Sequence, residues 1–239
     1  MQTTSISYDV DGTTMIGHLA VPDTAAPGSC PAVLVCHEGP GIDDHAKSRA
    51  DRLAGLGYVA FALDYHGGGM RLNGMPAMMA RLGPLMGNPE GIRALGRAGL
   101  SVLLSQPQVD SNRVAAIGYC FGGTMSLELA RGGENLKAVV GFHSGLGTAR
   151  SDDAANIKGK VLVCIGTEDP LIPPDQRTAF EAEMRAGKVD WRMNLYGGAA
   201  HSFTNPSASE AGIPGIEYHQ LTDERSWNAM LDLFAEVGM

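Results

Sequence analysis

The sequence contains 239 residues, of which 44% are hydrophobic and 18% are charged, as is typical of one globular α/β domain over residues 1–239. Its formal net charge is −8 and its basic residues form no cluster, which argues against a nucleic-acid partner. No basic N-terminal segment leads into an apolar run, and no stretch reaches the ~18 apolar residues of a membrane helix. We therefore expect a cytoplasmic protein that needs no membrane.

The N-terminal segment is predicted to form a β-hairpin, because residues 6–8 and 15–20 flank Asp11-Gly12, a dipeptide favoured in tight turns. After the hairpin, short apolar runs alternate with helical patterns that begin or end at Gly and Pro. Strands are expected at 31–37, 58–63, 114–117, 137–142, 160–165 and 189–196. Helices are expected between and after them, at 43–56, 89–106, 122–130, 174–186 and 223–237.

The methionine-rich segment 70–88 contains Pro76 and Pro84, and we interpret it as an irregular or short-helical cover over a pocket. Residues 197–218 are rich in Gly, Ser and Pro and are predicted to be a loop. The alternation of strands and helices predicts a mostly parallel central sheet flanked by helices on both faces. Right-handed crossovers place the carboxyl ends of its strands along one edge, where functional sites form.

The four cysteines have no CxxC spacing, which argues against a zinc knuckle or a thioredoxin-type site. No group of histidine, cysteine and acidic residues has the spacing of metal ligands, so we expect neither a metal nor a cofactor. Free thiols suit a reducing compartment. Cys36 and Cys164 lie inside apolar runs, where small soft side chains pack well, and Cys30 is interpreted as structural too.

The fourth cysteine stands in a different pattern: a short strand, then Gly-Tyr-Cys-Phe-Gly at 118–122, then a helix. A nucleophile on such a tight turn has strained dihedral angles, so its neighbours must lack side chains. The turn lifts Cys120 out of the sheet and directs the amino end of the helix toward its sulfur, which favours a thiolate. The N–H of Phe121 would then face a developing oxyanion. We interpret Cys120 as the nucleophile of a hydrolase; the alternative is a buried structural cysteine.

A nucleophilic cysteine needs a base, and the base needs an orienting acid. Asp169 follows the expected strand 160–165, and His201 follows the expected strand 189–196, so both should reach the edge of the sheet that carries Cys120. Glu168 competes as the acid, but Asp169 lies further into the turn. Four other histidines are set aside because they lack a matching acid and a strand-end position: His45, His66, His143 and His219.

Glu38 lies just past the strand 31–37, in a loop that normally supplies the second oxyanion N–H, here expected from Gly39. A carboxylate so close to a thiolate would raise the pKa of the thiol by repulsion between like charges. The same carboxylate could instead accept the proton of the thiol. The alternative is an acid that is simply solvated in a loop.

At these residues the chain resembles the dienelactone hydrolase family of α/β-hydrolases. The chain order of nucleophile, acid and histidine is that of the superfamily. The matching pieces are His37-Glu38-Gly39, Gly-Tyr-Cys-Phe-Gly-Gly at 118–123, Gly166-Thr167-Glu168-Asp169 and Ala200-His201-Ser202-Phe203.

The resemblance implies an α/β-hydrolase fold with a Cys-Asp-His triad that hydrolyses lactones or esters without a cofactor. It also implies that the glutamate at the position of Glu38 keeps the cysteine neutral until substrate arrives and then takes its proton. Family members that bind a substrate carboxylate use arginines, one of them shortly after the catalytic histidine. Here Ser-Phe-Thr-Asn-Pro follows His201, so a less charged ester or lactone competes with dienelactone as the substrate.

The expected partner is a small-molecule ester or lactone, and the expected assembly is a monomer or homodimer. Arg81, Tyr119 and Phe203 are the candidate substrate contacts. A second hypothesis is a non-catalytic or redox-sensing protein that binds small molecules on a hydrolase scaffold, since an exposed cysteine of low pKa also suits peroxide sensing. A cysteine peptidase is a third and weaker one, because a roof over the pocket suits small molecules better than peptides.

Overall fold

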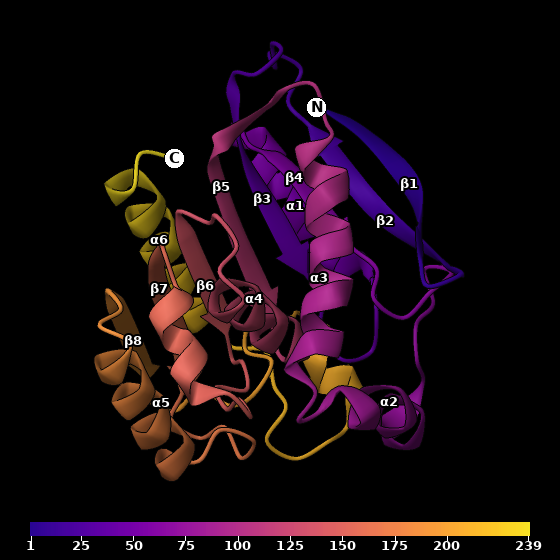
Figure 1. Cartoon of the computed structure of the whole chain (residues 1–239). Coiled ribbons are helices and arrows are strands. Elements are labelled where there is room, and N and C mark those ends of the chain that lie inside the picture. Colours follow the sequence, from indigo (N-terminus) through magenta and orange to yellow (C-terminus); the bar gives the residue numbers. More distant parts are fainter.

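The computed structural model of the chain describes residues 1–239, except for the side chain of Ala211. An eight-stranded sheet runs through the middle of the molecule, with its strands in the order β1-β2-β4-β3-β5-β6-β7-β8 (Figure 1). The strands are β1 (Gln2–Val10), β2 (Thr13–Val21), β3 (Cys30–Cys36), β4 (Val59–Leu63), β5 (Val109–Tyr119), β6 (Ala138–Phe142), β7 (Lys160–Gly166) and β8 (Trp191–Tyr196).

The predicted hairpin is confirmed as β1 and β2, which pair antiparallel along their whole length. Asp11 and Gly12 join them with φ angles of 50° and 79°, the left-handed pair that a tight hairpin turn requires. β2 pairs antiparallel with β4, and every later neighbour in the sheet is parallel. The mostly parallel sheet expected from the alternating pattern is thus confirmed, with an antiparallel hairpin at one edge.

Helices cover both faces of the sheet, as predicted. They are α1 (Asp44–Gly55), α2 (Gly74–Leu82), α3 (Pro89–Leu104), α4 (Phe121–Arg131), α5 (Pro174–Ala186) and α6 (Gln220–Glu236), with short 3-10 turns η1 (Gly83–Leu85), η2 (Ser151–Asn156) and η3 (Ala208–Ala211). α3, α4 and α5 lie in front of the sheet in Figure 1, while α1 and α6 lie behind it. Each face has its own apolar core: Leu103, Leu127 and Phe180 pack on the first, and Leu53 and Trp227 pack on the second.

The segment 70–88 forms short helical pieces, α2 and η1, which is one of the two forms expected from the sequence. Pro76 is the third residue of α2, within the first turn, where backbone N–H groups have no helical partner and proline is tolerated. Pro84 falls in η1, after α2 has ended. β5 also extends beyond the expected strand 114–117 in both directions. Val109 pairs with Cys30 of β3, the register then shifts across residues 110–113, and regular pairing resumes at Val114.

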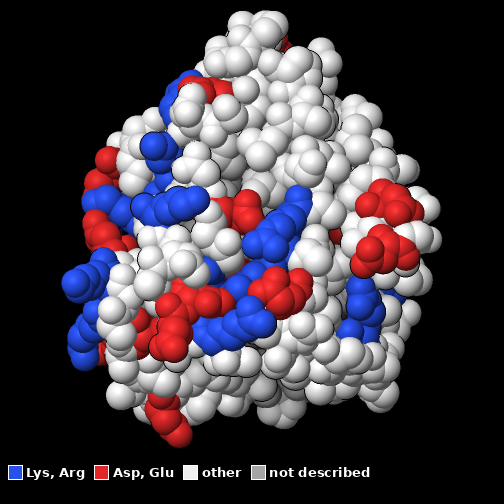
Figure 2. All heavy atoms as spheres, viewed as in Figure 1, with Lys and Arg blue, Asp and Glu red and all other residues white. Residues whose placement is uncertain are grey.

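Charged side chains of both signs lie next to one another over the face shown in Figure 2. None of the helices in the described part of the chain combines the length and the apolar character needed to cross a bilayer.

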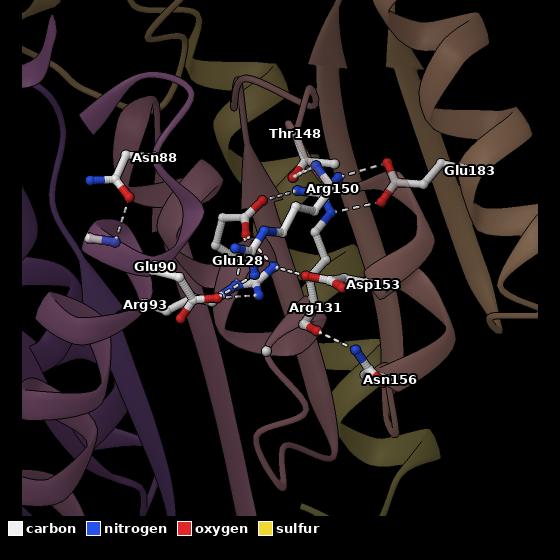
Figure 3. Close-up of polar contacts among 12 residues, drawn as sticks. Asn88, Glu90, Arg93, Glu128, Arg131, Thr148, Arg150, Asp153, Asn156 and Glu183 are labelled. Carbon is white, nitrogen blue, oxygen red and sulfur yellow. Dashed lines mark hydrogen bonds and ion pairs between the residues drawn. The ribbon is translucent and has the colours of Figure 1, made fainter. Parts of the chain in front are cut away.

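A buried network of arginines and glutamates ties α4 to its neighbours (Figure 3). The side chain of Arg131 is fully buried; its Nε and Nη2 donate to the Glu183 carboxylate of α5 at 2.7 and 2.8 Å, and its Nη1 donates to Glu128 at 3.1 Å. Arg93 of α3 donates to the other oxygen of Glu128 at 2.8 and 3.0 Å. Because α4 begins directly after Cys120, the network fixes the helix that follows this turn.

We expect the Arg131→Ala substitution to lower the free energy of unfolding by about 3–5 kcal/mol, because it leaves the buried Glu183 carboxylate without its cation. Urea unfolding followed by circular dichroism measures the loss. The matched control is Arg185→Ala, which removes an exposed pair with Glu181 four residues away on α5 and should change the free energy by less than about 0.5 kcal/mol. Equal losses of unfolding free energy in the two variants would contradict a stabilising role for the buried contact between Arg131 and Glu183.

Candidate functional site

Cys120 occupies a strained turn between β5 and α4. Its φ and ψ angles are 53° and −121°, a left-handed conformation that side chains rarely adopt. The flanking glycines are required by space: a Cβ on Gly118 would lie 2.0 Å from the Gly122 carbonyl oxygen, and a Cβ on Gly122 would lie 2.2 Å from the carbonyl oxygen of Cys36. The turn therefore has the geometry that the sequence pattern predicts.

Two backbone N–H groups stand beside this turn. Phe121 is the first residue of α4, so its N–H has no partner within the helix. Gly39 lies in the loop after β3, where an added Cβ would contact Leu82 and Met78 of α2 at 3.4 and 3.5 Å. Both residues line the same cavity as Cys120, which brings the two expected oxyanion donors to one place.

His201 and Asp169 form a buried pair at the neighbouring strand ends. The Nδ1 atom of His201, in the loop after β8, lies 2.8 Å from Oδ2 of Asp169, in the loop after β7. The N–H of Leu171 donates to the other carboxylate oxygen at 2.8 Å and fixes its orientation. Burial lowers the pKa of His201, but the Cys120 sulfur and the Asp169 carboxylate outweigh it and raise this pKa to about 10. Nε2 of His201 has no hydrogen-bond partner among the described residues, and His201 lines the cavity with Cys120.

Glu38 follows β3 and is 4% exposed. Its Oε2 atom accepts a hydrogen bond of 2.5 Å from Asn205, while Oε1 lies 3.8 Å from Nε2 of His143. Burial raises the pKa of Glu38, although hydrogen bonds from Asn205 and Ser202 offset part of the effect. The carboxyl group therefore shares the cavity wall with Cys120 but is turned toward Asn205.

These groups surround a cavity of about 540 Å³. Its wall includes Glu38, Gly39, Cys120, Phe121 and His201. α2 covers one side, as the sequence predicted for the methionine-rich segment, and the loops after β7 and β8 form the other. Within the described residues, no three histidine, cysteine or acidic side chains are grouped as metal ligands would be.

The chain matches the family model described as the Dienelactone hydrolase family over residues 15–238. The chain belongs to the dienelactone hydrolase family. Among solved structures, the one named m3DLH is 47% identical, covers 99% of this chain and 98% of its own, and superimposes with a TM-score of 0.95. A dienelactone hydrolase-like promiscuous phosphotriesterase from metagenomic libraries is 40% identical, with coverage of 99% and 98% and a TM-score of 0.93.

A curated relative from Salmonella typhimurium, named a putative carboxymethylenebutenolidase, is 26% identical over 225 residues, which is 90% of this chain and 80% of the relative. This dienelactone hydrolase family member thus has the α/β-hydrolase fold that its sequence motifs implied, and it is a hydrolase of the ester or lactone type.

None of the three candidate substrate contacts belongs to the described lining of this dienelactone hydrolase cavity. Tyr119 is fully buried and stacks on Phe142, with 4.9 Å between the ring centroids. Both side chains belong to the core on the face of the sheet away from the cavity. Phe203 is also fully buried. The guanidinium of Arg81 is occupied elsewhere, since its Nη2 donates to the Tyr65 carbonyl at 2.5 Å. Arg71, which was not among the expected substrate contacts, lines the cavity.

Two further residues at the site were passed over in the sequence. His143 was set aside for lacking a strand-end position, yet it directly follows β6, and the expected strand 137–142 already indicated this. It is fully buried, and its Nδ1 accepts the Cys120 N–H at 3.2 Å. Asn205 follows His201 by four residues, and its amide donates to Glu38, a contact between positions far apart in the chain for which the sequence carries no local signal.

Proposed function

We propose that the protein hydrolyses small-molecule carboxylic esters or lactones, with Cys120 as nucleophile, His201 as base and Asp169 as the residue that orients His201. The observation that carries this proposal is the 2.8 Å contact between Nδ1 of His201 and Asp169. This contact leaves Nε2 of His201 free at the cavity that Cys120 also lines. A base held in this way is the activation that a weak nucleophile requires.

Each step uses side chains of this chain and water. The Cys120 sulfur bonds to the carbonyl carbon, and its proton passes to Nε2 of His201, whose raised pKa allows it to hold that proton at neutral pH. The ester C–O bond then breaks, and His201 gives the proton to the leaving oxygen. A water molecule next adds to the thioester while His201 takes its proton; the C–S bond breaks, the acid leaves and the proton returns to sulfur.

The negative charge that develops on the carbonyl oxygen needs donors already in place. The N–H groups of Phe121 and Gly39 are proposed for this role, since both residues line the cavity beside Cys120. The amino end of α4 adds a favourable dipole at the same point.

We assign Glu38 as a second proton acceptor for the thiol, because it lines the cavity with Cys120 and because burial raises the pKa of its carboxyl group, which makes it a stronger base. Glu38→Gln preserves an acceptor for the Asn205 amide but removes the carboxylate. We expect kcat to fall by about 10²-fold with little change in KM. Stopped-flow and steady-state kinetics measure both constants.

The control for this variant is Asp43→Asn, which neutralises another carboxylate on the cavity wall while keeping the N-cap of α1. We expect near wild-type rates from it. A similar loss of kcat in both variants would show that wall charge, rather than a proton acceptor at Glu38, limits the rate.

The function is tested by initial rates of the purified protein on a panel of 4-nitrophenyl esters and lactones. We expect turnover, and we expect iodoacetamide to block it. The rate of this inactivation should depend on pH as the ionisation of a single thiol does. Absence of both turnover and a reactive thiol near neutral pH would favour the binding protein instead. A reactive thiol without turnover would favour the redox sensor.

A second substrate is suggested by the relative that is named a promiscuous phosphotriesterase. The wall of the cavity here is mostly apolar, which suits a neutral triester as well as a neutral ester. We expect the wild-type protein to release 4-nitrophenolate from diethyl 4-nitrophenyl phosphate, and we expect Cys120→Ala to abolish this release.

A further inference from the structure

The apolar face of α2 lines the cavity, and of its four residues Leu82 also belongs to the core on that face of the sheet. Met75, Met78, Met79 and Leu82 are spaced i, i+3, i+4 and i+7, which places them on one side of the helix, and all four line the cavity. Leu82 is the buried residue of α2, whereas Met75 and Met79 are each 45% exposed. An apolar stripe left open to a cavity is stabilised when the cavity holds apolar matter.

The opposite walls have the same character. Ile92 comes from α3 and Phe121 from α4, and further large apolar wall residues are Met86, Leu171, Ile172, Ile213 and Ile216. Methionine side chains are flexible and adapt to ligands of different shape. The cavity of about 540 Å³ is within the range of pockets that bind small organic molecules, and it is much larger than an acetyl group needs.

The charged groups of the wall do not favour an anion. Three of the lining residues are acidic: Glu38, Asp43 and Glu128. Among the described lining residues, the single lysine or arginine is Arg71. Glu128 is neutralised by the buried arginines behind it. A substrate carboxylate bound deep in this cavity would thus lose its water without gaining a buried lysine or arginine, and the charge of the buried His201 is already balanced by Asp169.

We propose that the acyl group of the substrate is uncharged and apolar, is longer than acetyl, and lies against the stripe Met75, Met78, Met79 and Leu82. This inference rests on the proposed function and names its substrate class. It separates this chain from hydrolases that anchor a substrate carboxylate with arginines.

The test compares three 4-nitrophenyl esters: the acetate, the hexanoate and the mono-adipate, which has the same chain length as the hexanoate but ends in a carboxylate. We expect kcat/KM for the hexanoate to exceed both others by at least about tenfold. A mono-adipate hydrolysed as well as the hexanoate, with that activity lost in Arg71→Gln, would overturn the proposal. If none of the three esters is hydrolysed, the proposed function itself fails.

A pair of variants locates the acyl group. Met79→Lys places a cation on the stripe, and we expect it to lower kcat/KM for the hexanoate and raise it for the mono-adipate. Leu104→Lys adds the same charge at a similarly exposed position, 41% against 45%, at the far end of α3, and should leave both unchanged. Equal responses of the two variants would place the acyl group elsewhere.

A second inference concerns His143 and rests on other contacts. The N–H of Cys120 is shared: it donates to the Phe142 carbonyl oxygen at 3.0 Å and to Nδ1 of His143 at 3.2 Å. Nε2 of His143 lies 2.8 Å from Oγ1 of Thr204. Since Nδ1 must be unprotonated to accept, Nε2 carries the proton and donates it to Thr204. The ring also meets His201 edge-on with a centroid distance of 5.1 Å.

We infer that His143 is a positioning residue, which acts together with the Phe142 carbonyl to hold the strained backbone of Cys120 so that its sulfur and the Phe121 N–H face the substrate carbonyl together. The ring is fully buried, and burial keeps its pKa well below the usual value for histidine, so the acceptor persists at neutral pH. Thr204 maintains the required tautomer from the other side of the ring.

The test replaces His143 with each of the two residues that have a side-chain amide, Asn and Gln. The side chain of Asn places its oxygen where Nδ1 lies and tolerates the left-handed φ of 39° at this position, whereas Gln reaches toward Nε2. We expect His143→Asn to keep most of kcat, and His143→Gln to lower kcat by at least about tenfold at unchanged KM and Tm. Equal kcat values in the two folded variants would overturn the inference.

If either amide variant does not fold, Thr204→Val gives the answer, because it keeps the ring and removes the hydroxyl that fixes its tautomer. We expect a lower kcat with an unchanged KM, and a wild-type kcat would overturn the inference.

Discussion

Cys120→Ala should lower kcat/KM for 4-nitrophenyl hexanoate by at least about 10⁴-fold. The substitution removes the only atom proposed to bond to the carbonyl carbon, while the buried pair of His201 and Asp169 and the apolar wall remain. Binding should therefore persist without turnover. Initial rates measure the first effect, and competition by the uncleaved ester against a chromogenic substrate of the wild type measures the second.

The matched control is Cys30→Ala. Cys30 is a buried cysteine at the start of β3, the end of that strand away from the site, and its removal should leave the rate nearly unchanged. Circular dichroism and thermal unfolding confirm that both variants fold. A Cys120→Ala protein that retains a tenth or more of the wild-type rate would rule out Cys120 as the nucleophile.

Asp169→Asn is expected to reduce kcat by about 10³- to 10⁴-fold. The amide of Asn can donate to Nδ1 of His201, which would move the imidazole proton to Nε2 and leave no base facing Cys120. The substitution also removes a negative charge that raises the pKa of His201, so this pKa should fall from about 10. Steady-state kinetics and NMR titration of the His201 ring measure the two effects.

Glu168→Gln serves as the control, since Glu168 is the adjacent acid and is exposed. Its removal should change neither kcat nor the pKa of His201. If Glu168→Gln gives the larger loss, the roles of the two acids are reversed.

The layers of the fold could be predicted from the sequence because both apolar runs and helix ends are local signals. The strand 31–37 and the helix 174–186 are found at β3 and α5 almost as expected. At 70–88 the pattern predicted the short-helical cover over the pocket but not its bounds, because Pro76 lies in the tolerant first turn of α2 and leaves no local mark of where the helix begins. Local patterns also could not place the hairpin, because its pairing with β4 depends on contacts far apart in the chain.

The residues around Cys120 were found because each follows a strand, and the topology of a parallel sheet brings strand ends together. Substrate contacts were harder, since they depend on which way a side chain points. Tyr119 adjoins Cys120 in sequence but packs into the opposite core, and Arg81 turns to the Tyr65 carbonyl. His143 also follows a strand directly, so its strand-end position alone predicts that it lies at the site, even without a nearby acid.

The central claim is that the reaction passes through a thioester on Cys120. It is tested most directly by mixing excess enzyme with 4-nitrophenyl hexanoate, quenching with acid during the first turnover and mapping the modified peptide by mass spectrometry. We predict a hexanoyl group on the peptide that contains Cys120, formed as 4-nitrophenolate is released and lost as hexanoate appears. A hexanoyl group on another side chain, or release of 4-nitrophenolate at the full rate with Cys120 unmodified throughout, would contradict the account.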